Sequence, residues 1–238
     1  VKNYWNRVKS QMVNEAISIV MIDEKTLEKL GSFPISREYY KTLIESLNKW
    51  WAAVIGFDII FADKNKDHIQ SDRNFAKAIK NAWNVILWGS IITKEIWWKA
   101  NRIIEKPIDI LDESKFSFWY FTPILSKTWV VLSFIPTANL SDKDWAISKY
   151  NHFAISLLKA YYSRLYNKDF MEDYNKQKDP NYFYLRPDYS IPFSKTWWNE
   201  VLINYIPLPS NSSGKISNFE TYSFVDVIEW KIDLKLFD

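Results

Sequence analysis

The sequence predicts an α/β fold: a mostly parallel or mixed central sheet with helices on both faces, and β-hairpins in the second half. Three observations support this prediction. Apolar runs alternate with helical segments between residues 17 and 92, in the β-α-β-α-β order of a parallel sheet. Pairs of extended runs joined by two-residue links follow in the second half. Hydrophobic residues make up 47% of the 238 residues, enough to bury the core of one domain.

Each element of the first half has its own local signal. Residues 17–22 are a short apolar run, which predicts a buried strand. Residues 24–30 form a helical pattern closed by Gly31, and Ser36 is a suitable N-cap for a helix over residues 37–49. The remaining expected elements are strands at residues 52–61 and 84–92 and a helix at residues 71–82.

The second half predicts shorter and more mixed elements. Residues 91–104 form a hairpin, and the amphipathic pattern of residues 152–166 predicts a helix. No internal repeat or composition break occurs, so we expect one domain over residues 16–238, truncated at its C-terminus, with residues 1–15 as a flanking segment. The other expected elements are helices at residues 122–128 and 223–229 and strands at residues 130–134, 146–150, 182–185, 189–193 and 200–205.

Glycine and tryptophan occur in unusual numbers. The chain has 4 Gly and 13 Trp, whereas average usage predicts roughly 17 Gly at this length. Several tryptophans stand where backbone geometry favours glycine, either after a predicted helix or in the link of a hairpin. We therefore predict a decoding effect, in which UGA codons that specify glycine were translated as tryptophan; the alternative is an authentic aromatic surface for carbohydrate. The positions are Trp50, Trp51, Trp83 and Trp230 after helices, and Trp97-Trp98 and Trp197-Trp198 in links.

Composition and motifs exclude several classes of function. The absence of cysteine excludes disulfides, thiol nucleophiles and Cys-ligated metals, and two histidines exclude a multi-histidine metal site. Lys and Arg number 31 against 28 Asp and Glu, which gives no reason to expect a nucleic-acid binder. No nucleophile elbow, Walker A or dinucleotide fingerprint occurs, so we assign no catalytic residue, metal or cofactor. The longest apolar stretch, residues 52–62, is too short to span a bilayer.

Two carboxylates stand at the ends of predicted strands. Asp23 and Asp58 each follow a strand, and ligands bind at that edge of an open parallel sheet. With Arg37 they form the floor of a candidate ligand pocket. The alternative is that each Asp caps the following segment or pairs with a basic neighbour. Asp63, Asp67 and His68 match no metal-ligand template when added to Asp58, so we expect a solvated loop there.

Seven sequence blocks carry a family resemblance through their order and spacing. They are IVMIDEKTL at residues 19–27, LGSFPISR at 30–37, VIGFDIIF at 54–61, NVIL at 84–87, DKDW at 142–145, LINY at 202–205 and YSFVDVIEW at 222–230. Together they resemble the CHASE2 domain, an extracytoplasmic sensor module of bacterial transmembrane receptors. In that family a glycine is usual at the positions of Trp83, Trp129, Trp145 and Trp230, which supports the decoding hypothesis.

The resemblance implies a function for the chain. We expect a non-enzymatic, extracytoplasmic signal-sensing domain that couples an unknown stimulus to a cytoplasmic output such as an adenylate or guanylate cyclase or a histidine or serine/threonine kinase. The partners would be a small-molecule or cell-envelope ligand and the membrane, reached through flanking segments outside this chain. By analogy with membrane receptors a homodimer is left open. The candidate ligand-binding residues are Asp23, Arg37, Asp58 and, from the LINY block, Asn204.

Two rival functions stay open at this stage. One is a hydrolase that uses Asp23 and Asp58 as paired carboxylates for acid–base or metal chemistry, which requires their oxygens to converge in a cleft. The other is a cell-envelope interaction module without a small ligand, which an exposed apolar patch without a pocket would favour.

Overall fold

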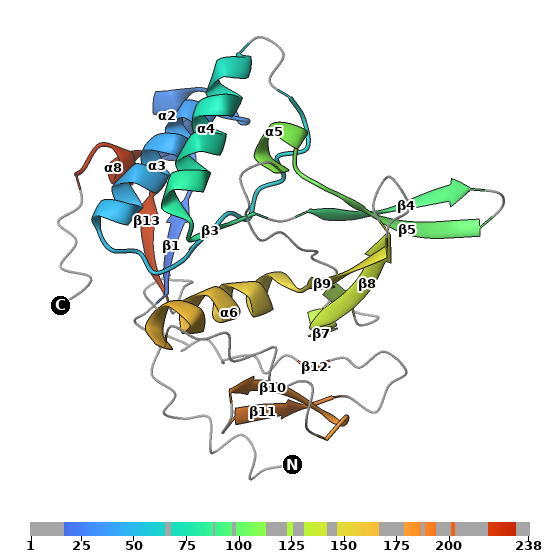
Figure 1. Ribbon diagram of the computed structural model, residues 1–238. Helices are drawn as coiled ribbons and strands as arrows, with labels where there is room; N and C mark the ends of the chain where they lie inside the picture. Colours follow the sequence, from blue (N-terminus) through green and yellow to red (C-terminus); the bar gives the residue numbers. More distant parts are fainter. Residues whose placement is uncertain are drawn as a thin grey trace, which may run out of the picture.

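The computed structural model describes residues 17–64, 68–87, 89–96, 99–112, 123–125, 131–141, 147–166, 179–186, 189–193, 201–202 and 219–231. Within these residues the fold is mixed α/β, with six helices and five small sheets (Figure 1). The α/β class predicted from the sequence is therefore confirmed, whereas a single central sheet is not shown.

Strong local signals define the first elements. They are β1 (Ser18–Met21), α2 (Glu24–Leu30), α3 (Arg37–Lys49), β2 (Ile55–Gly56), α4 (Ile69–Ala82) and β3 (Val85–Ile86). The Asp23 side chain caps α2 by accepting a hydrogen bond from the backbone N–H of Thr26, and Gly31 ends that helix with φ of 95°. Ser36 caps α3 by accepting a hydrogen bond from the backbone N–H of Glu38. Both helices have the bounds that the sequence predicts.

The later elements are shorter and largely extended. The bounds are β4 (Ser90–Ile96), β5 (Lys99–Glu105), α5 (Asp109–Asp112), β6 (Pro123–Leu125), β7 (Val131–Phe134), β8 (Thr137–Ser141), β9 (Ile147–Asn151), α6 (Phe153–Tyr166), β10 (Tyr182–Arg186), β11 (Tyr189–Pro192), β12 (Val201–Leu202), β13 (Glu220–Ser223) and α8 (Phe224–Ile228). The predicted hairpin at residues 91–104 is confirmed, because β4 pairs with β5 in antiparallel fashion. Strands β10 and β11 also pair antiparallel, although the sequence predicted them only as separate strands. The predicted hairpin link at Trp197-Trp198 lies outside the described residues.

Strand pairing is parallel at three places. β1 pairs with β13, β2 pairs with β3, and β5 pairs with β8. The last pair belongs to a four-stranded sheet of order β4-β5-β8-β9, and β12, β7 and β6 form a three-stranded antiparallel sheet. The β1–β13 pair joins segments from the two ends of the described chain, since Ser18 lies opposite Glu220.

The β1–β13 pair and the β2–β3 pair are not hydrogen-bonded to each other, but both contribute residues to one hydrophobic core. Helices α2, α3, α4 and α8 gather beside β1 and β13 (Figure 1). Tyr40 lies at the centre of this core and is 2% exposed. Its ring meets those of Phe57, Phe61, Phe75 and Phe224 at centroid distances of 5.3–5.9 Å. Residues of β2, α3, α4 and α8 thus bury their apolar faces together.

Helix α6 packs on the opposite face of β2. Ile55 and Phe57 belong to the Tyr40 core, and successive side chains of a strand point to opposite faces. A Cβ atom added at Gly56, between them, would lie 2.7 Å from Leu157 Cδ2 and 3.1 Å from Phe153 Cζ of α6. Helices therefore cover both faces of this strand, which is a local form of the layering that the sequence predicts.

Several expectations about individual elements were wrong. The outward side of β1 is not buried: Ile17, Ile19 and Met21 are 49%, 38% and 45% exposed. Residues 123–125 form strand β6 instead of the expected helix, because they pair with β7. Of the strand expected at residues 52–61, only β2 is a strand in the structure. The residues expected as one strand at 84–92 belong to two strands, β3 and the start of β4. Elements β8, β13 and α5 were not anticipated.

Candidate functional site

Asp23 connects the first strand–helix unit to the last one. Its Oδ1 accepts hydrogen bonds from Thr26 N at 3.0 Å, from Thr26 Oγ1 at 2.7 Å and from Ser223 Oγ at 2.8 Å. The fully buried Thr26 Oγ1 in turn accepts from the backbone N–H of Val225 at 3.3 Å. Burial alone would raise the pKa of Asp23, but the hydrogen bonds from Thr26 and Ser223 outweigh it and lower that pKa. The carboxylate therefore bridges β1–α2 and β13–α8.

Ion pairs at the surface add further contacts between β1–α2 and β13–α8. Lys25 Nζ on α2 lies 2.7 Å from Asp226 Oδ1 on α8. Lys29 on α2 pairs with Glu229 at the end of α8, and Lys231 Nζ lies 2.6 Å from the same carboxylate. Hydrogen bonds from Lys231 and Lys29 lower the pKa of Glu229. We call the set of contacts made by these ion pairs and by Asp23, Thr26 and Ser223 the terminal junction.

Arg37 belongs to a second, separate network. Its guanidinium donates from Nη1 to the carboxylate of Asp72 on α4 and from Nη2 to the backbone carbonyl of Asp63. Its Cζ also lies 5.7 Å from the centroid of the Phe61 ring. Asp72 is fully buried and Arg37 is 9% exposed. A buried charge is stable in a protein only when it is paired, so this pair fastens α3 to α4.

The other two predicted ligand-binding residues are Asp58 and Asn204. Asp58 follows β2, is exposed, and forms no hydrogen bond or ion pair with another residue that the structure describes. Asn204 lies outside the described residues. Asp23 and Arg37 therefore belong to two networks, and Asp58 joins neither of them. The sequence alternative of a capping role is confirmed for Asp23, which caps α2. No contact between Asp23 and Asp58 occurs among the described residues, so the carboxylate pair of a hydrolase gains no support from these contacts.

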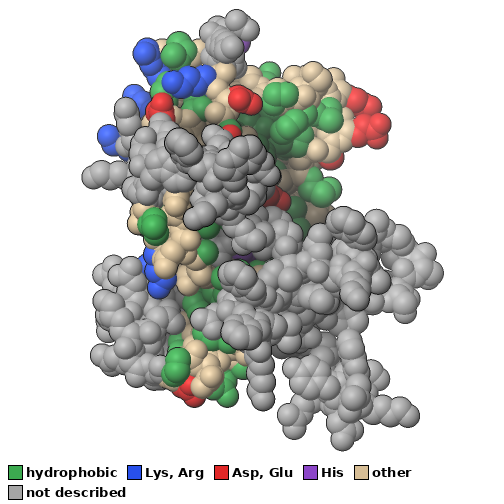
Figure 2. All heavy atoms as spheres, turned by 90° about the vertical axis from the view of Figure 1, so that its right-hand side faces the viewer, with side chains coloured by type: hydrophobic (Ala, Val, Ile, Leu, Met, Phe, Trp, Pro, Cys, Tyr) green, Lys and Arg blue, Asp and Glu red, His purple; other side chains and the backbone are tan. Residues whose placement is uncertain are grey.

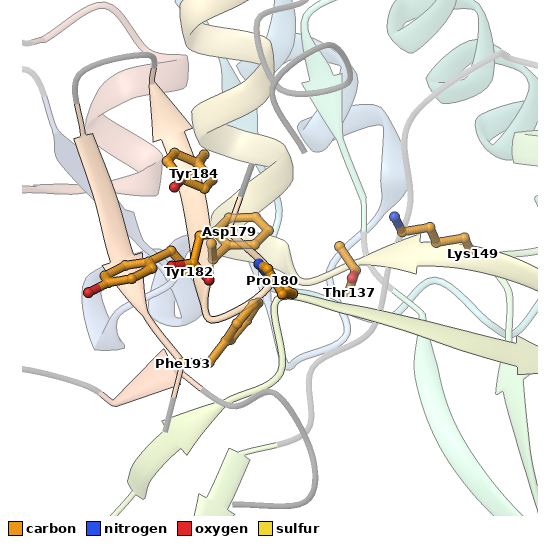
Figure 3. Close-up of a pocket in the computed structure, with 8 residues that line it drawn as sticks. Thr137, Lys149, Asp179, Pro180, Tyr182, Tyr184 and Phe193 are labelled. Carbon is orange, nitrogen blue, oxygen red and sulfur yellow. The ribbon is translucent and has the colours of Figure 1, made fainter. Parts of the chain in front are cut away.

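A small cavity lies between the β8–β9 hairpin and the β10–β11 hairpin. Its volume is about 200 Å³. Figure 3 shows Thr137 of β8 and Lys149 of β9 on one side, and Asp179, Pro180 and the aromatic residues of the other hairpin opposite them. Drug-sized ligands usually occupy cavities of about 300–1,000 Å³, so only a small molecule would fit here. No sequence signal anticipates the cavity, because its two sides come from distant segments.

His152 is a buried histidine at the start of α6. It is 6% exposed and its ring lies 4.6 Å from that of Phe134, centroid to centroid. Burial lowers the pKa of His152 from 6.5 to about 4. The imidazole is therefore neutral at neutral pH, which fits a structural histidine rather than a charged ligand-binding group.

The described part of the chain shows neither a candidate metal site nor a helix that could span a membrane. There, no group of three or more His, Cys, Asp or Glu side chains is arranged to hold a metal ion. Of the helices that could be searched, none combines the length and apolar character needed to cross a bilayer. On the face shown in Figure 2, Lys and Arg side chains gather near the upper left, with acidic side chains beside them and others at the upper right.

Comparison with known proteins identifies one family. The family model of the CHASE2 domain matches residues 3–238. No curated protein and no solved structure matches the chain. The family match spans the terminal junction, the Arg37–Asp72 pair and the cavity alike.

Proposed function

Because the chain belongs to the CHASE2 family, whose members are extracellular sensor domains of signalling receptors, we propose that it senses a stimulus outside the cytoplasmic membrane. CHASE2 domains are generally non-catalytic, so the chain itself carries no reaction in this proposal. The signal passes to a cytoplasmic output, for which an adenylate or guanylate cyclase or a histidine or serine/threonine kinase is the expected type. The observation that carries the proposal is the match of the family model over residues 3–238.

The terminal junction supports a route for the signal. It connects β1–α2, near the start of the domain, to β13–α8, near its end. A stimulus changes the state of a receptor only if it binds two states with different affinities. In our proposal the two states differ in how β13–α8 sits against β1–α2, and the chain beyond α8 leads to the output. The polar contacts of Asp23 and Lys25 are the ones that such a change would rearrange.

We propose that the ligand binds at some or all of four residues, which are Asp23, Arg37, Asp58 and Asn204. Asp58 is the strongest member because its exposed carboxylate has no described partner inside the fold. Asp23 and Arg37 already bind Ser223 and Asp72. A ligand at these two residues would compete with contacts that hold the fold together, and this competition is one way to couple binding to the junction. Asn204 and a homodimer are retained as predictions on the family resemblance.

Accessibility of the domain in cells tests the proposed location. The chain has no cysteine, so Lys77→Cys on the exposed face of α4 introduces a thiol in this domain. The full-length protein carrying Lys77→Cys is treated in intact cells, with the outer membrane permeabilised, with a membrane-impermeant maleimide. We expect labelling before lysis, with the unsubstituted full-length protein as the background control. Labelling of residue 77 only after lysis would contradict an extracytoplasmic location.

A pair of matched lysine variants tests the proposed route. Lys25→Ala removes a contact between α2 and α8, whereas Lys41→Ala removes an ion pair within α3, at 3.6 Å from Glu45. We expect the first variant to change the activity of the output domain in the full-length receptor, and the second to leave it at the level of the unsubstituted protein. Equal activities of the two variants would refute a role of the terminal junction in signalling.

A further inference from the structure

Three tryptophans have a backbone conformation that favours glycine. In the described residues, the non-glycine residues with positive φ are Trp51 at 62°, Trp83 at 53° and Trp230 at 59°. Positive φ is uncommon for any residue with a Cβ atom, and for a bulky side chain it is a genuine outlier. All three positions are occupied by the bulkiest amino acid, although tryptophan supplies only 13 of the 238 residues.

Each of these tryptophans stands at the residue that ends a helix in a left-handed turn. After α3, Trp51 N donates to Asn48 O at 3.1 Å and Ala52 N donates to Leu47 O at 3.0 Å. These are the two hydrogen bonds of a Schellman motif, with Trp51 at the C′ position. Glycine is the usual residue at that position, because it lacks the Cβ atom that a left-handed conformation disfavours.

The ends of α8 and α4 repeat this geometry. Trp230 N donates to Val227 O at 3.4 Å and Lys231 N donates to Asp226 O at 3.1 Å, which is a second Schellman motif. Trp83 N donates to Ile79 O at 3.0 Å, the single hydrogen bond of the simpler left-handed cap. Three helices of different sequence thus place a tryptophan at the same special backbone position.

Two residues of the chain serve as internal controls. Helix α2 also ends with positive φ, and its terminal residue is the glycine Gly31, at 95°. Trp50, next to Trp51, has an ordinary φ of −92° and packs partly buried against the core. Among the described residues, positive φ therefore coincides with glycine or with tryptophan, and a neighbouring tryptophan with ordinary φ contributes to packing.

The three side chains contribute little to the fold. Trp51, Trp83 and Trp230 are 79%, 71% and 47% exposed. The Trp83 ring contacts Arg164 Cζ at 4.9 Å, and the Trp230 ring contacts Lys49 Nζ at 4.6 Å. The Trp230 ring also meets the Trp50 ring edge-on, with their centroids 5.2 Å apart. An authentic tryptophan in a strained turn would need compensating burial, which Trp51 and Trp83 lack and which Trp230 has only in part.

We propose that positions 51, 83 and 230 are glycine in the natural protein, encoded by UGA codons that the source organism reads as glycine and that were translated here as tryptophan. The composition agrees with this, since 4 Gly and 13 Trp together equal the roughly 17 Gly expected for the length. One codon reassignment explains both the count and the backbone. It also removes three exposed tryptophans from the aromatic surface on which a carbohydrate-binding role would rest.

The codons and the natural protein give the decisive test. The gene is sequenced at codons 51, 83 and 230, and the peptides that contain these positions are identified by mass spectrometry in protein from the source organism. UGA codons with the residue mass of glycine are the expected result. UGG codons, or the residue mass of tryptophan at these positions, would overturn the proposal without affecting the proposed sensor function.

Folding stability provides an independent measurement on the recombinant chain. We expect Trp51→Gly, Trp83→Gly and Trp230→Gly each to lower the ratio of unfolded to folded protein by roughly three- to ten-fold, because relief of the left-handed conformation exceeds the entropic cost of glycine. Trp50→Gly is the matched control and should raise that ratio, since its backbone gains nothing and its packing is lost. Destabilisation by all four substitutions would contradict the backbone argument.

Discussion

Replacement of Arg37 by methionine tests whether this residue acts mainly in the structure. The substitution keeps an unbranched side chain but removes the Arg37 guanidinium from the fully buried carboxylate of Asp72. Removal of one partner of a buried ion pair costs about 3–5 kcal/mol. The carbonyl of Asp63 loses its guanidinium donor in the same variant. We therefore expect a loss at the upper end of that range.

The expected loss is a large part of the stability of a domain. Native domains unfold with about 5–15 kcal/mol, and 1 kcal/mol shifts Tm by about 2–4 °C at this chain length. Arg37→Met should therefore lower Tm by roughly 10–20 °C. Urea titration followed by far-ultraviolet circular dichroism measures the free energy of unfolding directly. Lys41→Met, which breaks an exposed ion pair with Glu45, is the control and should cost no more than about 0.5 kcal/mol.

A double-mutant cycle separates the ion pair from other effects. Asp72→Leu alone leaves Arg37 buried without its carboxylate, whereas Arg37→Met with Asp72→Leu removes both charges. The double variant should lose less free energy of unfolding than the sum of the two single variants. A loss below about 1 kcal/mol in Arg37→Met would refute the structural reasoning and return Arg37 to the ligand-binding set.

Three further substitutions and conditions have expected outcomes. The hydroxyl of Tyr40 is buried with no hydrogen-bond partner in the described structure; Tyr40→Phe should leave stability unchanged or raise it by up to about 1 kcal/mol in urea titration, and a loss would reveal a hidden partner. Because burial lowers the pKa of His152 from 6.5 to about 4, the unfolded chain binds more protons over that interval. Stability should therefore fall as pH falls from 6.5 towards 4, by up to about 3 kcal/mol, and His152→Phe should remove this part of the pH dependence. A Cβ at Gly89 would lie 2.6 Å from the Glu105 backbone oxygen, whereas one at Gly56 meets mobile side-chain ends of α6. Gly89→Ala should thus cost about 1–3 kcal/mol and Gly56→Ala less, as thermal melts of the two variants would show.

Local signals in the sequence predicted the early helices well. Ser36 and Gly31 define helix ends through their own side chains or backbone freedom, so the bounds of α2 and α3 follow from a few neighbouring residues. Strand β13 has no such signal, because Glu220–Ser223 is polar and becomes a strand only by pairing with β1. The failure at residues 123–125 has the same cause, since pairing with β7 outweighs local preference.

In the candidate site, too, the sequence predicted contacts between neighbouring residues and missed contacts between distant segments. The capping role of Asp23 was stated as an alternative from the sequence, but its bond to Ser223 depends on segments 200 residues apart. The partner of Arg37 was missed, because the sequence analysis placed Asp72 in the helix at residues 71–82 without assigning it a contact. A signal was present: Asp72 precedes Phe75, Ala76 and Ile79 at the spacing of one helix face, and all three are buried. A carboxylate on an apolar stripe indicates a buried cation nearby.

The parallel pairing of β1 with β13 has a consequence for biosynthesis. The first strand leaves the ribosome long before its partner, since Ser18 pairs with Glu220. At translation rates of about 5–20 residues per second, β1 waits roughly 10–40 s for that partner. During this interval its hydrogen-bonding edge and the apolar side chains of Ile17, Ile19 and Met21 are open to other chains. The β1–β13 pair thus forms only after residue 223 has been synthesised, and the nascent chain is a natural substrate for chaperones until then.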